Sequence, residues 1–323
     1  MKAVTLSAYG STDKLELSDV PEPKVGPNDV KVRMAGASIN PIDWKLRSGA
    51  MQAMMPLVFP AVLGRDVSGE VVAVGSAVSH LKVGARVMGL VTDAYAELVV
   101  APAEAWTEVP ATMDLVDAAA LPLVLLTGAQ LIEEAVCVRK GDVFLVTGAV
   151  GSVGRAAVFV AKATGAQVWA GVRASQKAEA IALGAHGVIA LDRDEDLAKI
   201  PLLDAIADTI GGPTLSKLFV RMKPGGTIGT VVGDPAGAKE QGLVVRGAMT
   251  HPDAPRLGAL AKAVAAGELV IPIAKRFPLA EARKAQDLAE DHVGGKVILT
   301  GPFVARAAVR GATGHDQSTL HQP

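Results

Sequence analysis

The alternation of hydrophobic and polar positions changes character near residue 116. Before it, short β-like runs follow one another and are separated by Gly and Pro at short intervals. The clearest runs span residues 30–34, 68–74 and 97–101. Many short strands with frequent turn residues are typical of an all-β, barrel-like domain.

After residue 116, strand-like and helix-like patterns alternate. The strand-like runs are 143–146, 167–172, 187–190, 204–210, 227–232 and 243–247, and the helix-like runs between them are 153–164, 176–183 and 215–222. This alternation predicts βαβ units and a parallel, doubly wound sheet, so the fold class is α/β. Two further helices, 255–266 and 279–291, and a strand, 296–300, complete the pattern. The tail that follows is polar toward its end, and we expect its last residues to be mobile.

Composition narrows the class of protein. The 323 residues include 50% hydrophobic and 20% charged side chains, which can build a large core, and the length suggests two domains. The formal net charge is −1 and no basic block occurs, so nothing points to nucleic acid. The longest uncharged run, 118–132, is short and contains Pro122 and Gly128, so we expect no membrane span.

A single cysteine, Cys137, rules out a disulfide within the chain and a cysteine-rich zinc lobe. This use of cysteine fits a reducing cytoplasm. Cys137 stands among Ala135, Val136 and Val138, so we expect it to be a small, buried apolar residue.

Three glycines, Gly148, Gly151 and Gly154, lie between the apolar run 143–146 and a helix-like run. Such a turn lets backbone N–H groups and the positive end of a helix meet a pyrophosphate. The spacing departs from G-x-G-x-x-G because Ala149 holds the first glycine position. The candidate cofactor contacts in this turn are Gly148, Ala149, Val150, Gly151, Ser152, Val153 and Gly154.

The strand-like run 167–172 is followed by no acidic residue that would bind the ribose 2′-hydroxyl of NAD. It is followed instead by Arg173, Ser175 and Lys177, which suit a 2′-phosphate. The sequence therefore predicts NADPH as the cofactor. The alternative is that Arg173 and Lys177 only begin a solvated helix.

Seven segments, in order, match one known family. They are 38–49 (SINPIDWKLRSG), 64–75 (GRDVSGEVVAVG), 82–87 (KVGARV), 95–99 (YAELV), 208–212 (DTIGG), 224–228 (PGGTI) and 294–298 (GGKVI). Over about residues 1–300 the chain resembles the medium-chain dehydrogenase/reductase superfamily, and within it the zinc-free, zeta-crystallin-like quinone oxidoreductase branch.

The resemblance implies an architecture. A GroES-like β-barrel domain would comprise residues 1–118 and 256–323, a Rossmann dinucleotide-binding domain would comprise 119–255, and the active site would lie between them. It further implies cofactor contacts at Thr127, Val232 and Gly233, and a cytoplasmic homodimer. Leu191 stands where relatives often have a tyrosine, which puts one ribose contact in doubt.

The resemblance also bears on metal binding. Zinc-dependent relatives have a cysteine near Asn40 and a His-Glu pair after Gly64, whereas this chain has Arg65 and Asp66 there. His80, the nearest histidine, is expected at the surface. We therefore expect no metal site. Without a Lewis acid, alcohol oxidation is disfavoured, and reduction of a quinone or an activated C=C bond is left.

Four residues are candidates for the chemistry. Asn40 could donate a hydrogen bond to the reacting carbonyl, or it could be a turn residue before Pro41. Asp43, Lys45 and Tyr95 could hold the cofactor or relay a proton. Alternatively, Asp43 caps a helix that starts at Trp44, Lys45 is a solvated surface residue, and Tyr95 packs in the core.

The leading interpretation is an NADPH-dependent reductase that transfers hydride to a quinone or an α,β-unsaturated carbonyl without zinc. An enoyl-thioester reductase of the same fold is an alternative. A non-catalytic NADPH-binding sensor or structural protein is another, because a fold does not dictate function.

Overall fold

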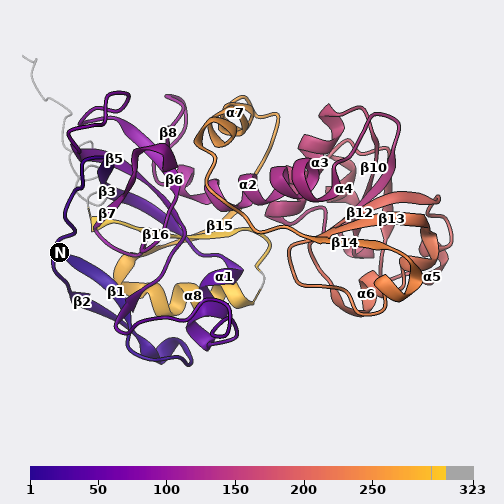
Figure 1. Ribbon diagram of the computed structural model, residues 1–323, viewed down its shortest axis with the longest axis horizontal. Coiled ribbons are helices and arrows are strands. Elements are labelled where there is room, and N and C mark those ends of the chain that lie inside the picture. The colour runs from indigo at the N-terminus through magenta and orange to yellow at the C-terminus, as the bar shows by residue number, and fades with distance from the viewer. Residues whose placement is uncertain (292, 303–323) are drawn as a thin grey trace, which may run out of the picture.

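The computed structural model describes residues 1–291 and 293–302. Two lobes lie side by side in Figure 1, one built from the indigo and purple N-terminal part and the other from magenta and orange segments. The yellow C-terminal strands lie in the first lobe. The tail that was expected to be mobile falls outside the described residues.

The first lobe contains two sheets. A seven-stranded sheet has the order β15-β16-β3-β5-β6-β8, with β7 also paired to β3, and a three-stranded sheet has the order β2-β1-β4. The elements before the second lobe are β1 (Lys2–Leu6), β2 (Leu15–Asp19), β3 (Asp29–Ser38), α1 (Pro41–Ser48), β4 (Ala61–Val62), β5 (Asp66–Val74), β6 (Arg86–Leu90), β7 (Leu98–Pro102) and β8 (Trp106–Glu108).

The chain returns to this lobe at its C-terminal end. After α7 (Ala254–Ala265), β15 (Ile273–Pro278), α8 (Ala282–Glu290) and β16 (Lys296–Thr300) follow, and β16 pairs antiparallel with β3. The hydrophobic pattern predicted β16 with its bounds but missed β15, whose exposed charges, Lys275 and Arg276, hide the strand pattern. The division into domains at residues 118/119 and 255/256 stays a prediction.

The second lobe is a six-stranded parallel sheet with the order β11-β10-β9-β12-β13-β14. Its strands are β9 (Val143–Thr147), β10 (Gln167–Val172), β11 (Gly187–Ala190), β12 (Leu203–Asp208), β13 (Met222–Thr230) and β14 (Val244–Gly247). The order confirms the predicted doubly wound sheet and is that of two joined βαβαβ halves. Ligands bind such sheets where the order reverses, here between β9 and β12.

Helices cover this sheet (Figure 1). They are α2 (Pro122–Gln130), α3 (Ser152–Ala163), α4 (Lys177–Ile181), α5 (Asp194–Leu197) and α6 (Gly212–Ser216). The prediction of a helix over 215–222 is wrong. The chain forms α6 and a short 3-10 turn, Phe219–Arg221, because Met222 already begins β13.

One of three apolar clusters among the described residues runs through both lobes. It joins Ala35, Met88 and Leu90 of the first sheet to α2 and to the second sheet. A 3-10 turn, α2 and a π-helical turn form one helical run, Asp117–Val136, which is apolar enough to cross a membrane. However, 83% of its apolar window is buried, so the core accounts for its composition. The sequence patterns predicted no helix here, and the run extends beyond the uncharged stretch 118–132.

Candidate active site

The glycine turn joins β9 to α3 as predicted. Gly148 has a φ of 62°, which favours glycine, and a Cβ on Gly154 would overlap the carbonyl oxygen of Gly148 and lie 2.8 Å from Ala149 Cα. Gly151 is the N-cap of α3, and no side chain caps the helix there. Its missing Cβ would meet only Gly148 O, at 3.2 Å. The turn therefore leaves α3 amides free on an open side.

The other four residues of the turn flank Gly151 in the sequence. Ala149 is buried and its N–H donates to Gly171 O at 3.1 Å, which anchors the turn to β10. Val150, Ser152 and Val153 are half-buried. The assignment of these residues to cofactor binding stays a prediction. The turn consists of backbone groups and short side chains, which suits the close approach of a cofactor phosphate.

Polar side chains at three neighbouring strand ends form a cluster that the sequence analysis missed. Asp208, which is fully buried, accepts hydrogen bonds from Thr147 Oγ1 at 2.8 Å and from Thr230 Oγ1 at 3.0 Å. Val232 and Gly233 follow directly, and Thr230 Oγ1 also contacts the Val232 N–H at 3.2 Å. The cluster fixes the strand ends at the switch point. The available signal for this cluster in the sequence was that an aspartate or a threonine ends each of the three apolar, strand-like runs.

The loop after β10 holds the residues expected to select the cofactor. Arg173 and Ser175 are exposed, and no ion pair of Arg173 occurs among the described residues. Lys177, in contrast, lies 2.5 Å from Asp196 Oδ2, so its charge is already paired. Lys177 and Lys199 hold the pKa of Asp196 well below its usual range. Only part of the predicted positive charge is therefore free.

No acid directly follows β10 in the sequence, but the fold brings Asp192 to this loop from the end of β11. Asp192 Oδ1 accepts the N–H of Ala174 at 2.8 Å. β10 and β11 are parallel neighbours, with Val172 opposite Ala190, so residues that follow them meet. Sequence distance hid Asp192, whose carboxylate is bound by the backbone of the loop.

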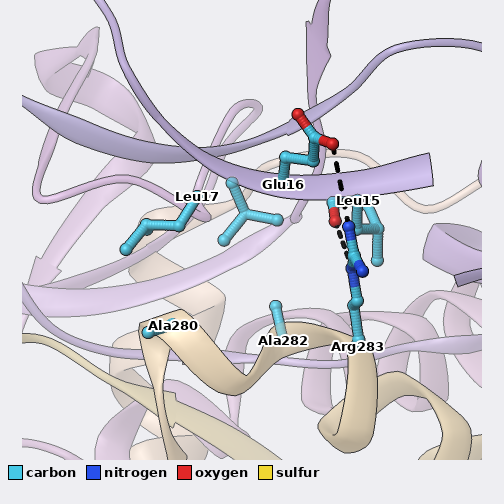
Figure 2. A pocket seen from close by; sticks show the side chains of 7 residues that line it. Leu15, Glu16, Leu17, Ala280, Ala282 and Arg283 are labelled. Atoms are coloured by element: carbon cyan, nitrogen blue, oxygen red, sulfur yellow. Dashed lines mark hydrogen bonds and ion pairs between the residues drawn. The ribbon is translucent and has the colours of Figure 1, made fainter. Parts of the chain in front are cut away.

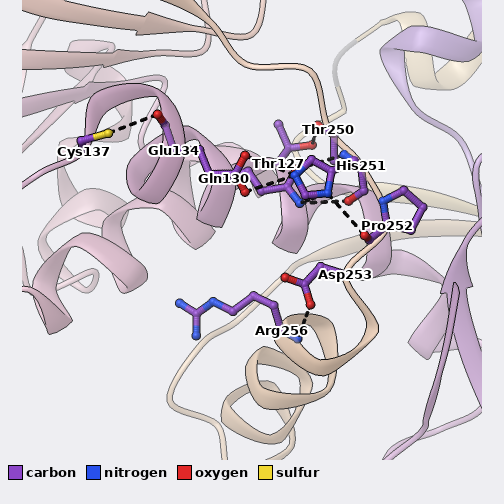
Figure 3. Close-up of polar contacts among 9 residues, drawn as sticks. All are labelled: Thr127, Gln130, Glu134, Cys137, Thr250, His251, Pro252, Asp253 and Arg256. Atoms are coloured by element: carbon purple, nitrogen blue, oxygen red, sulfur yellow. Dashed lines mark hydrogen bonds and ion pairs between the residues drawn. The ribbon is translucent and has the colours of Figure 1, made fainter. Parts of the chain in front are cut away.

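Thr127 lies on α2, next to the segment that crosses between the lobes (Figure 3). Its Oγ1 is 2.7 Å from Thr250 Oγ1. One turn later, the Gln130 amide donates to His251 O at 2.9 Å and accepts the His251 N–H at 3.1 Å. His251 Nε2 lies 3.2 Å from Glu134, and this hydrogen bond raises the pKa of the imidazole. Thr127 thus contributes to the contact that holds Thr250 and His251 against α2.

The segment with Asn40 forms a second polar cluster, in the first lobe. The helix α1 starts at Pro41 with Asn40 as its N-cap, so the alternative of a helix that starts at Trp44 is wrong. Asp43 lies at the third helical position and accepts the Asn40 N–H at 2.8 Å. Pro41 already has the backbone conformation of a first helical residue, which explains the earlier start.

Asn40 is fully buried and its carboxamide is engaged. Its Nδ2 donates to Asp66 Oδ2 at 2.8 Å and lies 3.4 Å from Ser38 O, while its Oδ1 accepts from Lys296 Nζ at 2.5 Å. Both amide hydrogens therefore have partners in the protein. Sequence reasoning missed Asp66 and Lys296, which are distant along the chain.

Tyr95 and Asp43 form a buried pair. The Tyr95 hydroxyl donates to Asp43 Oδ2 at 2.8 Å, and both residues are fully buried. Burial raises the pKa of Asp43 to about 6, against the opposing effect of the Tyr95 hydrogen bond. Burial and the Asp43 charge raise the pKa of Tyr95 well above its usual value. The core position expected for Tyr95 is confirmed, with a hydroxyl that serves Asp43.

The remaining predicted positions differ in their settings. Lys45 is half-buried, and its side chain makes no hydrogen bond in the described part of the chain. His80 is exposed, as expected. Cys137 is exposed and not buried, because it ends the π-helical turn with a φ of 56° that directs it away from the core.

No group of three His, Cys, Asp or Glu side chains suited to a metal occurs in residues 1–291 and 293–302. Arg65 is half-buried at the place where zinc-dependent relatives have a histidine. A groove of about 400 Å³ lies between β2 and the start of α8 (Figure 2). It is lined by Val4, Leu15, Glu16, Leu17, Ala280, Ala282 and Arg283, so it contains none of the candidate residues.

Two family models match the chain. "Alcohol dehydrogenase GroES-like domain" covers residues 26–111, and "Zinc-binding dehydrogenase" covers residues 183–299. A quinone oxidoreductase of Pseudomonas aeruginosa is 31% identical over 92% of this chain and 99% of its own length. A chloroplast envelope quinone oxidoreductase homolog of Arabidopsis thaliana is 29% identical over 93% and 98%.

The solved structures agree with this likeness. The quinone oxidoreductase from Coxiella burnetii is 32% identical and superposes with a TM-score of 0.83, covering 93% of this chain and 99% of that one. The strand order, the glycine turn and these full-length matches lead to one assignment, which implies a nicotinamide cofactor. The chain is an oxidoreductase that belongs to the medium-chain dehydrogenase/reductase superfamily, as a homologue of its quinone oxidoreductases.

Proposed function

We propose that the protein is an NADPH-dependent reductase that transfers hydride to a quinone or an α,β-unsaturated carbonyl without zinc. The observation that carries the proposal is the uncapped N-terminus of α3 behind Gly151, in a chain whose relatives include quinone oxidoreductases. The zinc-free chemistry is supported by the segments 38–49 and 64–75, which contain no cysteine or histidine that could bind zinc.

The turn fits a dinucleotide on its own geometry. The open side of Gly151 admits a phosphate, the α3 amides attract it, and Gly154 keeps α3 against the turn. Val232 and Gly233 follow β13 beside the switch point and would line the same site. The bound nicotinamide would supply the hydride.

The preference for NADPH is supported by Arg173, an exposed guanidinium without an ion pair in the described residues, and by the hydroxyl of Ser175. Lys177 contributes less, since Asp196 neutralises it. Asp192 opposes a phosphate, although a backbone N–H already binds its Oδ1. Arg173 therefore carries the proposed selectivity.

Asp43 and Tyr95 would hold protons beside Asn40, in the segment proposed to take part in the reaction. Asp43 Oδ1 is buried and has no hydrogen-bond partner among residues 1–291 and 293–302. Because burial raises the pKa of Asp43 to about 6, we propose that Oδ1 takes up the proton while Oδ2 keeps the Tyr95 hydrogen bond. A direct bond from Asn40 to the substrate would require its amide to leave Asp66 or Ser38. We therefore propose that Asn40 acts by holding this segment in place.

The substrate class is tested by NADPH oxidation with quinones, enones, alkenals and enoyl thioesters. Turnover with quinones or enones is the expected result. Turnover with enoyl thioesters alone would contradict the proposed substrate class and identify the protein as an enoyl-thioester reductase. Tight NADPH binding without any turnover would favour a sensor. The homodimer, the cytoplasmic location and the division into domains stay part of the proposal.

A further inference from the structure

Asp66 is a fully buried carboxylate that joins the two lobes. Its Oδ2 accepts hydrogen bonds from Ser38 Oγ at 2.6 Å and from Asn40 Nδ2 at 2.8 Å. Its Oδ1 accepts the N–H of Leu123 at 2.6 Å, in the first turn of α2. Leu121 is the N-cap of α2 and offers no side-chain acceptor. Asp66 therefore caps α2 from a strand of the other lobe.

Lys296 is the buried partner of this carboxylate and comes from β16, near the end of the described chain. Its Nζ donates to Ile39 O at 3.0 Å and to Asn40 Oδ1 at 2.5 Å, and it lies 3.6 Å from Asp66 Oδ2. Together, the two charged groups hold each of the three consecutive residues 38–40.

The helix α2, which Asp66 caps, also connects to the glycine turn. α2 packs closely on α3, since a Cβ on Gly128 would lie 2.6 Å from Ala156 Cβ and 2.8 Å from Val153 O. α3 begins directly after Gly151. Contacts therefore run without a gap from Asn40 through α2 to the turn proposed to bind the pyrophosphate.

Stability is a weak reason for burying these charges. Taking an ammonium and a carboxylate out of water costs several kcal/mol each, and apolar replacements of buried ion pairs are often neutral or stabilising. What an apolar pair could not supply is the set of directed bonds to residues 38–40 and to Leu123.

We propose that Asp66 and Lys296 are positioning residues, a buried ion pair that keeps residues 38–43 in register with the cofactor lobe during the reaction. This inference rests on the proposed function. The pair adds one positive and one negative charge beside Asp43, the other carboxyl of the cluster, and Tyr95 completes the groups that face it.

The two members of the pair act on Asp43 in opposite directions. The Asp66 charge raises the pKa of Asp43, and the Lys296 charge lowers it. Asp66→Asn should therefore move the Asp43 midpoint downward, and Lys296→Met should move it upward. A purely structural role would loosen the cluster in both variants and shift the midpoint the same way.

The first measurement is an NMR titration of the full-length protein labelled with ¹³C-carboxyl aspartate, in which Asp43→Asn identifies the signal. Opposite shifts of about one pH unit are expected. The matched control is Lys223→Met, which breaks an ion pair with Asp204 at 2.7 Å in the second lobe and should leave the midpoint in place. Shifts of the same sign in the two variants would overturn the proposal.

The second measurement separates positioning from cofactor binding. Asp66→Ala removes the α2 cap and should lower kcat at least about tenfold, while the Kd for NADPH changes less than about threefold. Asp66→Asn keeps an oxygen for Leu123 and should restore part of kcat. An unchanged kcat, or a parallel loss of NADPH affinity, would contradict the proposal. If the wild-type protein turns over no acceptor, the proposed function fails, and the titration still decides whether the pair acts on Asp43.

Discussion

The glycine turn and the Asn40 cluster are held in their conformations by opposite means. The turn between Gly148 and Gly154 relies on backbone and on small residues that leave space, and the buried Arg155 supports it by donating from Nε to Val150 O at 2.9 Å. The Asn40 cluster relies on buried side chains, among them Asp43, Asp66 and Lys296. The turn can bind a phosphate only if no side-chain atoms block the approach to its backbone. The cluster is ordered only if several side chains are in place together.

This difference predicts different responses to substitution. In the turn, the cost of an added side chain depends on which direction its Cβ faces. In the cluster, the cost depends on which charge is left without a partner, because an unpaired buried charge is expensive. The following predictions test each half of the comparison.

The largest effect is expected from Gly154→Val, paired with Gly151→Val. The Gly154 side chain would overlap the backbone of Gly148 and Ala149, so the protein should be destabilised by about 3 kcal/mol or more. Gly151 has φ −67° and ψ 160°, which any residue adopts, so Gly151→Val should fold and lose NADPH binding. Thermal melts and NADPH titrations check both. Retained NADPH affinity in Gly151→Val would refute the phosphate assignment.

The next effect concerns pH and Asp43. Its folded pKa of about 6 exceeds the usual value near 4, so the native state binds more protons in this window. Its contribution to stability therefore falls as pH rises from about 4 to about 6, by on the order of 3 kcal/mol. Asp43→Asn removes this loss. Urea unfolding at several pH values should show the variant gaining on the wild type as pH rises, and a constant difference would contradict the raised pKa.

A smaller effect is expected from Arg173→Ala. Losing a charge-assisted bond to phosphate should weaken NADPH binding by about 10- to 100-fold and leave NADH binding nearly unchanged. Lys177→Ala is the matched control, since Asp196 already neutralises Lys177, and a change of less than about threefold is expected. Calorimetric titrations with both cofactors measure this. Equal losses for NADPH and NADH in Arg173→Ala would exclude a phosphate contact.

The smallest effect is expected from metal removal. A catalytic zinc needs about three protein ligands, and Asn40 and Arg65 stand at two of the positions in question. Prolonged treatment with a chelator should leave reductase activity unchanged. Elemental analysis that finds one zinc per chain, together with lost activity, would overturn the zinc-free proposal.

The same comparison explains what could be predicted from sequence. The parallel sheet and the glycine turn were predictable because hydrophobic alternation and glycine spacing are local. Asp66 and Lys296 were missed as partners of Asn40 because 230 positions separate residues 66 and 296, and only the return of β16 to β3 brings them together. Asp192 was missed for the same reason, as it joins the loop after β10 from the end of β11.

Cys137 shows a different limit. Its apolar neighbours Val136 and Val138 predicted burial, but the residue ends a π-helical turn in the left-handed conformation. Local hydrophobicity does not report where a helix ends, and the direction of the last side chain depends on that point.

The central claim, NADPH-dependent reduction without zinc, is tested most directly by comparing NADPH and NADH with one quinone acceptor in the wild-type protein. The account predicts that kcat/KM for NADPH exceeds that for NADH by about tenfold or more, in line with one phosphate contact through Arg173. Equal or higher efficiency with NADH, or no turnover of either cofactor, would contradict it.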